Sequence, residues 1–131
     1  MKSGLYREMC VGVAESVSHV ENARILANRA VVTSGYWLDG SAPNFDRHHR
    51  PSLAYRMAAV AEGKFDGMIT LRPTWEWDVA AGVLMVEEAG GTVCDRTGNT
   101  LLFNNPTPQS RGLIATTATL RDQFLEKLDR I

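Results

Sequence analysis

The sequence has few cysteines and no long hydrophobic run, and each absence excludes a class of protein. Only Cys10 and Cys94 are cysteines, and they lie far apart, in no metal-like spacing. We therefore expect no disulfide framework, and we interpret both as reduced core thiols of a cytoplasmic protein. No stretch approaches the roughly 20 apolar residues of a membrane-spanning helix, and Met1–Cys10 lacks the apolar run of a signal peptide. We expect a soluble protein with no membrane partner.

An excess of charge of one sign is also missing. Lys and Arg together number 14, Asp and Glu 15, and the formal net charge is -1. A nearly neutral chain has no general electrostatic attraction for a nucleic acid polymer or an anionic membrane surface. The hydrophobic share of 44% and the charged share of 22% are those of an ordinary globular domain, and 131 residues fit one such domain.

The sequence does contain short apolar runs that alternate with helical patterns. Strands are predicted at Met9–Val13, Ala23–Ala27, Phe65–Leu71, Thr92–Asp95 and Leu113–Thr117. Helices are predicted from Ser52 to a stop at Gly63, from Asp78 to Ala89 and from Thr119 to Leu128, with a long loop at Thr33–Arg50. This alternation predicts an α/β fold, a layered sheet with helices on both faces. We assign residues 23–131 to one domain and leave residues 1–22 as a separate N-terminal segment.

Asp78 lies at the N-terminal end of an almost wholly apolar helix, which ends at Gly90 and Gly91. One interpretation is an N-cap, in which the carboxylate accepts hydrogen bonds from first-turn N–H groups. The other is a ligand for a hard cation such as Mg²⁺, with the helix end holding a phosphate nearby. The two roles are compatible in one site.

A resemblance favours the second role. The stretches Glu76–Gly82 and Glu88–Gly91 resemble the C-terminal signature of the inositol monophosphatase family of Mg²⁺-dependent phosphatases. The preceding Val60–Gly67 resembles the helix-to-strand stretch that leads into that signature. The Glu-Trp-Asp sequence at positions 76–78 and the Ala-Glu-Gly-Lys sequence at positions 61–64 are most similar to those of one branch of the family, which dephosphorylates 3′-phosphoadenosine 5′-phosphate. The resemblance extends from about Ala23 to the C-terminus, and it implies the fold of the family's C-terminal domain.

The resemblance implies that Asp78 binds a catalytic Mg²⁺. The family builds most of its metal cluster from N-terminal motifs, a Glu-Glu pair and Asp-Pro-Ile/Leu-Asp-Gly-Thr, and neither motif precedes the Trp77-Asp78 pair in this sequence. Leu38–Ser41 has a similar Asp-Gly, but its spacing and position differ, and Asp-Gly favours a turn there. One carboxylate cannot hold a cluster of Mg²⁺ ions. We therefore expect this chain to provide one metal ligand and part of the substrate-binding surface.

The start of the first long helix is the candidate substrate site. The resemblance places Arg56 at a position where the nucleotidase branch has a lysine, with Ser52 near a serine-rich turn. An arginine at this position would bind a phosphate through two hydrogen-bond donors. The alternative interpretation is that Arg56 is a solvent-exposed charged residue on the helix surface. A basic residue that the same branch carries before its Trp-Asp pair falls at Thr70, whereas Arg72 is displaced.

Several further residues have two interpretations. The cluster Arg47, His48, His49 and Arg50 is either a solvated loop or an anion contact. Trp75 and Trp77 are candidates for stacking a nucleobase, but burial beside an apolar helix is the interpretation we prefer for Trp77. Asp66 reads as a turn residue, and Glu87 and Glu88 as solvent-facing residues at a helix end.

Together these features predict Mg²⁺-dependent hydrolysis of a small phosphate monoester, of the 3′-phosphoadenosine 5′-phosphate or inositol phosphate type. The isolated chain is expected to have little activity, because the water-activating residues would come from elsewhere. The alternative is an inactive relative that serves as an oligomerisation or regulatory module. Exposed apolar surface would favour a homo-oligomer or a partner that supplies an N-terminal half.

Overall fold

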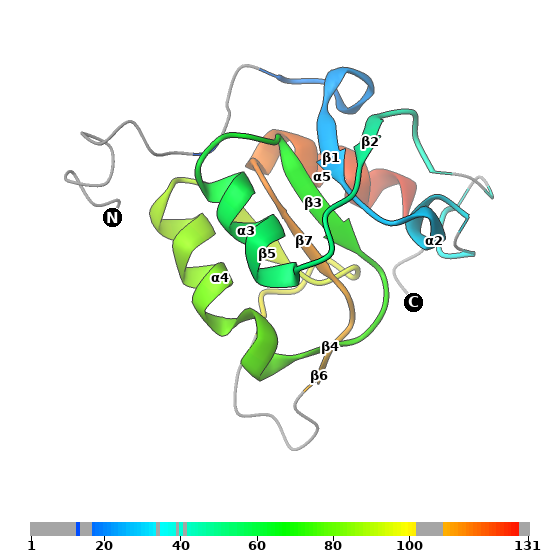
Figure 1. The fold of residues 1–131 in the computed structure, drawn as a ribbon. Coiled ribbons are helices and arrows are strands. Elements are labelled where there is room, and N and C mark those ends of the chain that lie inside the picture. The colour runs from blue at the N-terminus through cyan, green and yellow to red at the C-terminus, as the bar shows by residue number, and fades with distance from the viewer. Residues whose placement is uncertain are drawn as a thin grey trace.

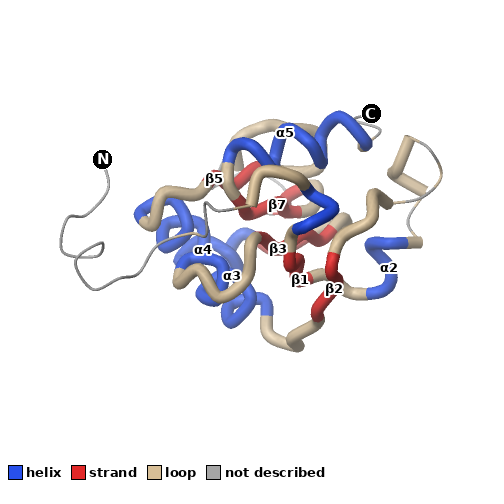
Figure 2. The backbone as a smooth tube through the Cα atoms, turned by 90° about the horizontal axis from the view of Figure 1, so that it is seen from above, coloured by secondary structure: helices blue, strands red, loops and turns tan. Residues whose placement is uncertain are grey.

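The computed structural model describes residue 13 and residues 17–33, 35–38, 40, 42–101 and 109–128. A five-stranded sheet lies at its centre, with α3 (Leu53–Ala61) and α4 (Glu76–Glu88) on one face and α5 (Ala118–Lys127) on the other. Figure 1 looks onto α3 and α4, and Figure 2 shows the three layers from above. The predicted layered α/β fold with helices on both faces is confirmed. In the described residues no helix is both long and apolar enough to span a membrane.

The sheet is mixed, with the strand order β2-β1-β3-β7-β5. The strands are β1 (Arg24–Leu26), β2 (Asp46–His48), β3 (Gly67–Thr70), β5 (Thr92–Cys94) and β7 (Leu113–Thr116). The strands β2, β1 and β3 are parallel, and β7 runs antiparallel to both β3 and β5. Parallel neighbours need a crossover connection, and α3 lies in the connection that leads to β3.

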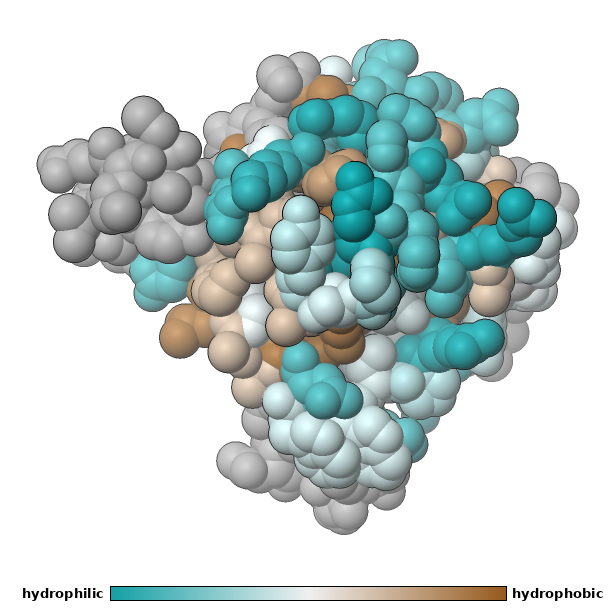
Figure 3. All heavy atoms as spheres, viewed as in Figure 1, coloured by the Kyte–Doolittle hydropathy of each residue, from teal (hydrophilic) through white to brown (hydrophobic). Residues whose placement is uncertain are grey.

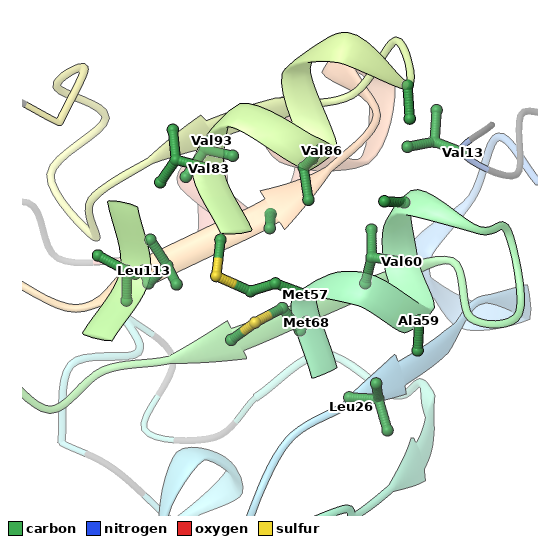
Figure 4. Packing of buried hydrophobic residues seen from close by; sticks show 14 residues of the cluster. Val13, Leu26, Met57, Ala59, Val60, Met68, Val83, Val86, Val93 and Leu113 are labelled. Carbon is green, nitrogen blue, oxygen red and sulfur yellow. The ribbon is translucent and has the colours of Figure 1, made fainter. Parts of the chain in front are cut away.

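One core cluster fills the space between the sheet and the helix pair α3 and α4 (Figure 4). Its larger members include Met57 and Val60 from α3, Val83 and Val86 from α4, and Met68 and Leu113 from the sheet. The helix pair is closely packed at Gly82, where an added Cβ would lie 2.9 Å from the Cβ of Met57. The absence of a side chain at Gly82 therefore sets how near α4 lies to α3.

A second core cluster lies on the opposite face of the sheet and includes Leu120 and Phe124 of α5. Phe124 of α5 is buried there, with ring centroids 6.4 Å from Trp37 and 5.9 Å from Phe45. The short 3-10 helix η1 (Val20–Asn22) joins this layer, because the Val20 amide donates to Gln123 Oε1 at 2.8 Å. The Trp37 indole donates to the Val31 carbonyl at 2.6 Å, which satisfies its buried N–H.

Most predicted elements are present, and the strands are shorter than predicted. Four predicted strands contain β1, β3, β5 and β7, and the predicted helix ends are confirmed at Ser52, the N-cap of α3, and near Gly63, which has φ +77. The helix α5 begins one residue earlier than predicted, because the Thr117 hydroxyl caps it. Of the strand predicted at Met9–Val13 only Val13 is described, and its amide donates to the Ala89 carbonyl at 3.2 Å. The division at residue 23 stays a prediction.

The prediction of a loop throughout Thr33–Arg50 is wrong, because β2 lies within it. This edge strand is charged and polar, so it lacks the apolar alternation that marks a half-buried strand. Four further elements were not predicted: the 3-10 helix η1, the one-turn helix α2 (Arg29–Val32) and the paired strands β4 (Thr74–Trp75) and β6 (Gln109–Ser110). Each is too short to show a periodicity.

Asp66 does lie in a bend, but its role extends beyond a turn. Its side chain is 1% exposed, and Oδ2 accepts from the Arg24 amide at 2.6 Å and from Arg24 Nε at 3.3 Å. The Thr116 hydroxyl donates to the Asp66 carbonyl at 2.6 Å. Asp66 therefore joins the starts of β1 and β3 to the end of β7.

Candidate functional site

The first turn of α3 presents Ser52 and Arg56. The Ser52 hydroxyl oxygen accepts a hydrogen bond from the Tyr55 amide at 3.1 Å, which is the N-cap geometry. Because the oxygen is the acceptor, the exposed hydroxyl still has its proton to donate to an anion. Arg56 is half-buried, and its Nε donates to the Ser52 carbonyl at 3.4 Å. Burial lowers the pKa of Arg56 from its ordinary value, yet an arginine stays cationic at neutral pH.

Asp78 lies in the first turn of α4, but it is not the N-cap. The helix begins at Glu76, two residues earlier than predicted, and the N-cap is Trp75, which makes no side-chain capping bond. The N-cap interpretation of Asp78 is therefore wrong. Its carboxylate is exposed and has no hydrogen-bond or ion-pair partner within the described part of the chain. A carboxylate in this turn is stabilised by the positive end of the helix dipole and stays available to a ligand.

The fold brings the first turns of α3 and α4 to the same end of the helix pair. The two helices run side by side in the same sense (Figure 1). Asp78 lies one turn before Gly82 on the same flank of α4, and Gly82 is the residue that packs against Met57 of α3. Asp78 therefore faces the α3 side of the helix pair, toward the end where Ser52 and Arg56 lie.

These residues do not form a complete metal site. Among the described residues no group of three or more His, Cys, Asp or Glu side chains could hold a metal ion. Mg²⁺ prefers six oxygen ligands in near-octahedral geometry, and Asp78 supplies one carboxylate. Asp78 therefore fits the role of one ligand in such a centre. The residues of this chain alone do not support a reaction step that involves a metal.

Beside Asp78 lies an aromatic pair whose exposure sequence reasoning missed. The rings of Trp75 and Trp77 stack with centroids 4.7 Å apart at an interplanar angle of 12°. Trp77 is 66% exposed and Trp75 41%, so the preferred interpretation of Trp77 as a buried residue is wrong. The helical spacing of the apolar residues could have predicted the exposure of Trp77. Val79 and Val83 lie on the face of α4 that turns toward α3 and the sheet, and Trp77 lies on the opposite side of the helix.

The basic cluster is engaged in local contacts. Arg47 Nη1 donates to the Ala27 carbonyl at 3.2 Å, and His48 Nε2 lies 2.9 Å from Asp46 Oδ2. The Arg50 guanidinium lies 5.5 Å from the centroid of the Phe65 ring, and its Nη1 donates to the His49 carbonyl at 2.7 Å. These contacts agree better with a structured edge of the sheet than with an anion site.

The Asp-Gly stretch after Leu38 contains the expected turn. The Gly40 amide donates to the Trp37 carbonyl at 3.0 Å, and Gly40 has φ +78. Asp39 and Ser41 lie outside the described residues.

A separate hollow lies where β1 and β3 end. Its lining includes Asn28, Tyr36, Thr70 and Arg72. The carboxyl ends of parallel strands are the usual ligand-binding edge of an α/β sheet. Thr70 and Arg72, the two positions compared with a basic residue of the nucleotidase branch, therefore line one pocket.

Comparison with known proteins gives the family context. Residues 8–131 match the model of the inositol monophosphatase family. The Nus factor SuhB of Escherichia coli K12 is 43% identical over 84 residues, which cover 60% of this chain and 30% of SuhB. Inositol monophosphatase 2 of Solanum lycopersicum is 37% identical over 78 residues, which cover 60% of this chain and 28% of that protein.

The fold is also that of solved structures. An IMPase from Thermotoga maritima superposes with a TM-score of 0.69 at 26% identity, covering 88% of this chain and 43% of the other. The chain thus spans less than half the length of the relatives it matches.

Proposed function

Because this chain belongs to the inositol monophosphatase family, we propose that it forms one wall of a Mg²⁺-dependent phosphatase site. The observation that carries the proposal is the exposed, unpartnered carboxylate of Asp78 in the first turn of α4, on the flank that faces α3. Members of this family are generally metal-dependent. A Mg²⁺ bound in such a site would supply activation of a water molecule and stabilisation of charge on the phosphate.

In this proposal the residues in the first turns of α3 and α4 have different roles. Asp78 provides one carboxylate oxygen to the metal. The Ser52 hydroxyl donates to a phosphate oxygen, and Arg56 supplies positive charge and N–H donors to the same group. We infer that the substrate is a small phosphate monoester, first the 3′-phosphate of an adenosine bisphosphate and next an inositol phosphate. Further carboxylates would have to come from outside the described residues.

A non-catalytic module is the second candidate. It is favoured by the lone carboxylate, since the described residues contain no metal-binding group. The two candidates differ in ligand binding, because a module without a residual site would bind neither Mg²⁺ nor a nucleotide at this position.

Calorimetric titration with 3′-phosphoadenosine 5′-phosphate, with and without Mg²⁺, tests the proposal. Asp78→Asn should abolish the Mg²⁺-dependent gain in affinity, whereas Arg56→Gln should weaken nucleotide binding about tenfold under both conditions, as expected for one lost charged hydrogen bond. The matched control is Asp122→Asn, which neutralises an exposed carboxylate on α5 and should change neither.

Three results would count against parts of the proposal. No nucleotide binding by the unmodified chain would favour the non-catalytic module. Equal Mg²⁺-dependent binding by Asp78→Asn would remove the metal-ligand role. Strong Mg²⁺-dependent phosphate release by the purified chain would show that the site is complete.

A further inference from the structure

Two exposed indole rings lie together where α4 begins. Trp75 and Trp77 are 41% and 66% exposed, and their rings stack with centroids 4.7 Å apart at an interplanar angle of 12°. We call these two rings the aromatic platform. In Figure 3 the surface over α3 and α4 is mostly tan and pale, whereas teal residues gather over β1 and β2. The platform therefore lies on a weakly charged side of the molecule, which suits a flat, uncharged ring better than an ion.

Regular secondary structure holds both rings of the platform in place. Trp75 belongs to β4, where it is paired with Gln109 of β6, and Trp77 lies in the first turn of α4. The Trp75 ring covers one face of the Trp77 ring. Because Trp77 is still 66% exposed, the other face of its ring is open to solvent. An open aromatic face on a fixed ring is the kind of surface on which a nucleobase stacks in proteins that bind single-stranded nucleic acids.

The platform adjoins the candidate phosphate site. Asp78 directly follows Trp77, and its exposed carboxylate has no partner among the residues that the structure describes. Consecutive residues of a helix are about 1.5 Å apart along its axis. In a nucleotide one ribose separates the base from each phosphate, so a single molecule can reach both the platform and Asp78. An inositol phosphate has no aromatic ring to place on the platform.

We propose that the open face of Trp77 stacks on the base of a nucleoside phosphate, and that this contact makes the site prefer a nucleotide over an inositol phosphate. The inference rests on the proposed function for the position of the phosphate. Trp77 is then the residue that determines specificity. Trp75 is a positioning residue, because it supports the Trp77 ring on the side away from the base.

Tryptophan fluorescence with adenosine tests the stacking contact alone, since adenosine has a base and no phosphate. The unmodified chain should show a saturable loss of emission as adenosine is added, and ribose should cause none. Trp77→Ala should remove the saturable loss. Leu84→Ala is the matched control: Leu84 is 60% exposed, lies two turns further along the same side of α4, and should leave the loss unchanged.

Calorimetric titration without Mg²⁺ tests the preference between substrates. Trp77→Ala should lower the affinity for 3′-phosphoadenosine 5′-phosphate about tenfold, as expected for one lost stacking contact, and leave the affinity for inositol monophosphate unchanged. Trp77→Phe should retain most of the nucleotide affinity, because phenylalanine keeps an aromatic face. Far-UV circular dichroism of every variant checks that the fold is retained, which is expected because Trp77 and Leu84 are exposed.

The inference is overturned if adenosine causes no saturable loss of emission, or if Trp77→Ala weakens the binding of nucleotide and inositol monophosphate equally. It is also overturned if Leu84→Ala acts like Trp77→Ala. The proposed function fails separately: a saturable loss with adenosine, together with no effect of Mg²⁺ on nucleotide binding, would remove the metal role of Asp78 and leave the stacking contact in place.

Discussion

Cys94 is a buried free thiol, which confirms its interpretation as a core residue, whereas Cys10 lies outside the described residues. Burial raises the pKa of Cys94 to about 11 from an ordinary value of 9.0, and the nearby Arg121 opposes this only in part. The neutral thiol is therefore the form that fits the folded state. Its contribution to stability is fully present below about pH 9 and is lost as the pH rises toward about 11.

The measurement is urea unfolding at a series of alkaline pH values, with Cys94→Ala as the control. The difference in unfolding free energy between the two proteins should shrink as the pH rises through that window, because the unfolded thiol ionises first. A difference that stays constant with pH would contradict the shifted pKa of Cys94.

The candidate residues show what a single sequence could predict. Asp78 was identified because its neighbours form a contiguous motif, and its place in the first turn of a helix is confirmed. Its interpretation as a cap was wrong because α4 begins after Trp75, a residue without a capping oxygen, so no signal marked the true start. The pairing of Asp66 with Arg24 joins residues 42 positions apart, and no local pattern contains such a partner.

At the scale of elements, the long periodic helices and the fully buried strands were predictable. The strands β3 and β7 are buried at all four positions, so they read as continuous apolar runs. The short edge strand β2 and the two-residue pair β4 and β6 were not predictable, since pairing rather than composition defines them. The layering followed from the alternation of elements, but the strand order required the structure.

The contact between α3 and α4 gives a prediction for Gly82. Gly82→Ala should lower the free energy of unfolding by about 1–3 kcal/mol, despite the better helix propensity of alanine, because the new Cβ overlaps Met57. Gly35→Ala is the matched control, since nothing lies within 4 Å of an added Cβ there and its backbone needs no positive φ. Denaturant unfolding of both variants checks the prediction, and an equal effect of the two would contradict close packing at Gly82.

Across the whole molecule, the central strands link the two core clusters. Met68 and Leu113 point into the cluster beneath α3 and α4, whereas their chain neighbours Ile69 and Ile114 point into the cluster beneath α5. The strands β3 and β7 are paired over all four of their residues. Loss of packing on one face therefore removes the support of the strands that carry the other face.

The whole described domain should thus unfold in one cooperative transition. Trp37 is 2% exposed beneath α5, and replacing Trp75 and Trp77 with Phe would leave it the only tryptophan. Its fluorescence and the far-UV circular dichroism of the helices should then give the same urea midpoint.

In that background Met68→Ala, on the opposite face from Trp37, should lower the free energy of unfolding by about 2–5 kcal/mol and lower both midpoints equally. Ile114→Ala, on the Trp37 face, should do the same. A Met68→Ala protein whose Trp37 midpoint stays in place while the helical signal shifts would show that the two faces unfold independently.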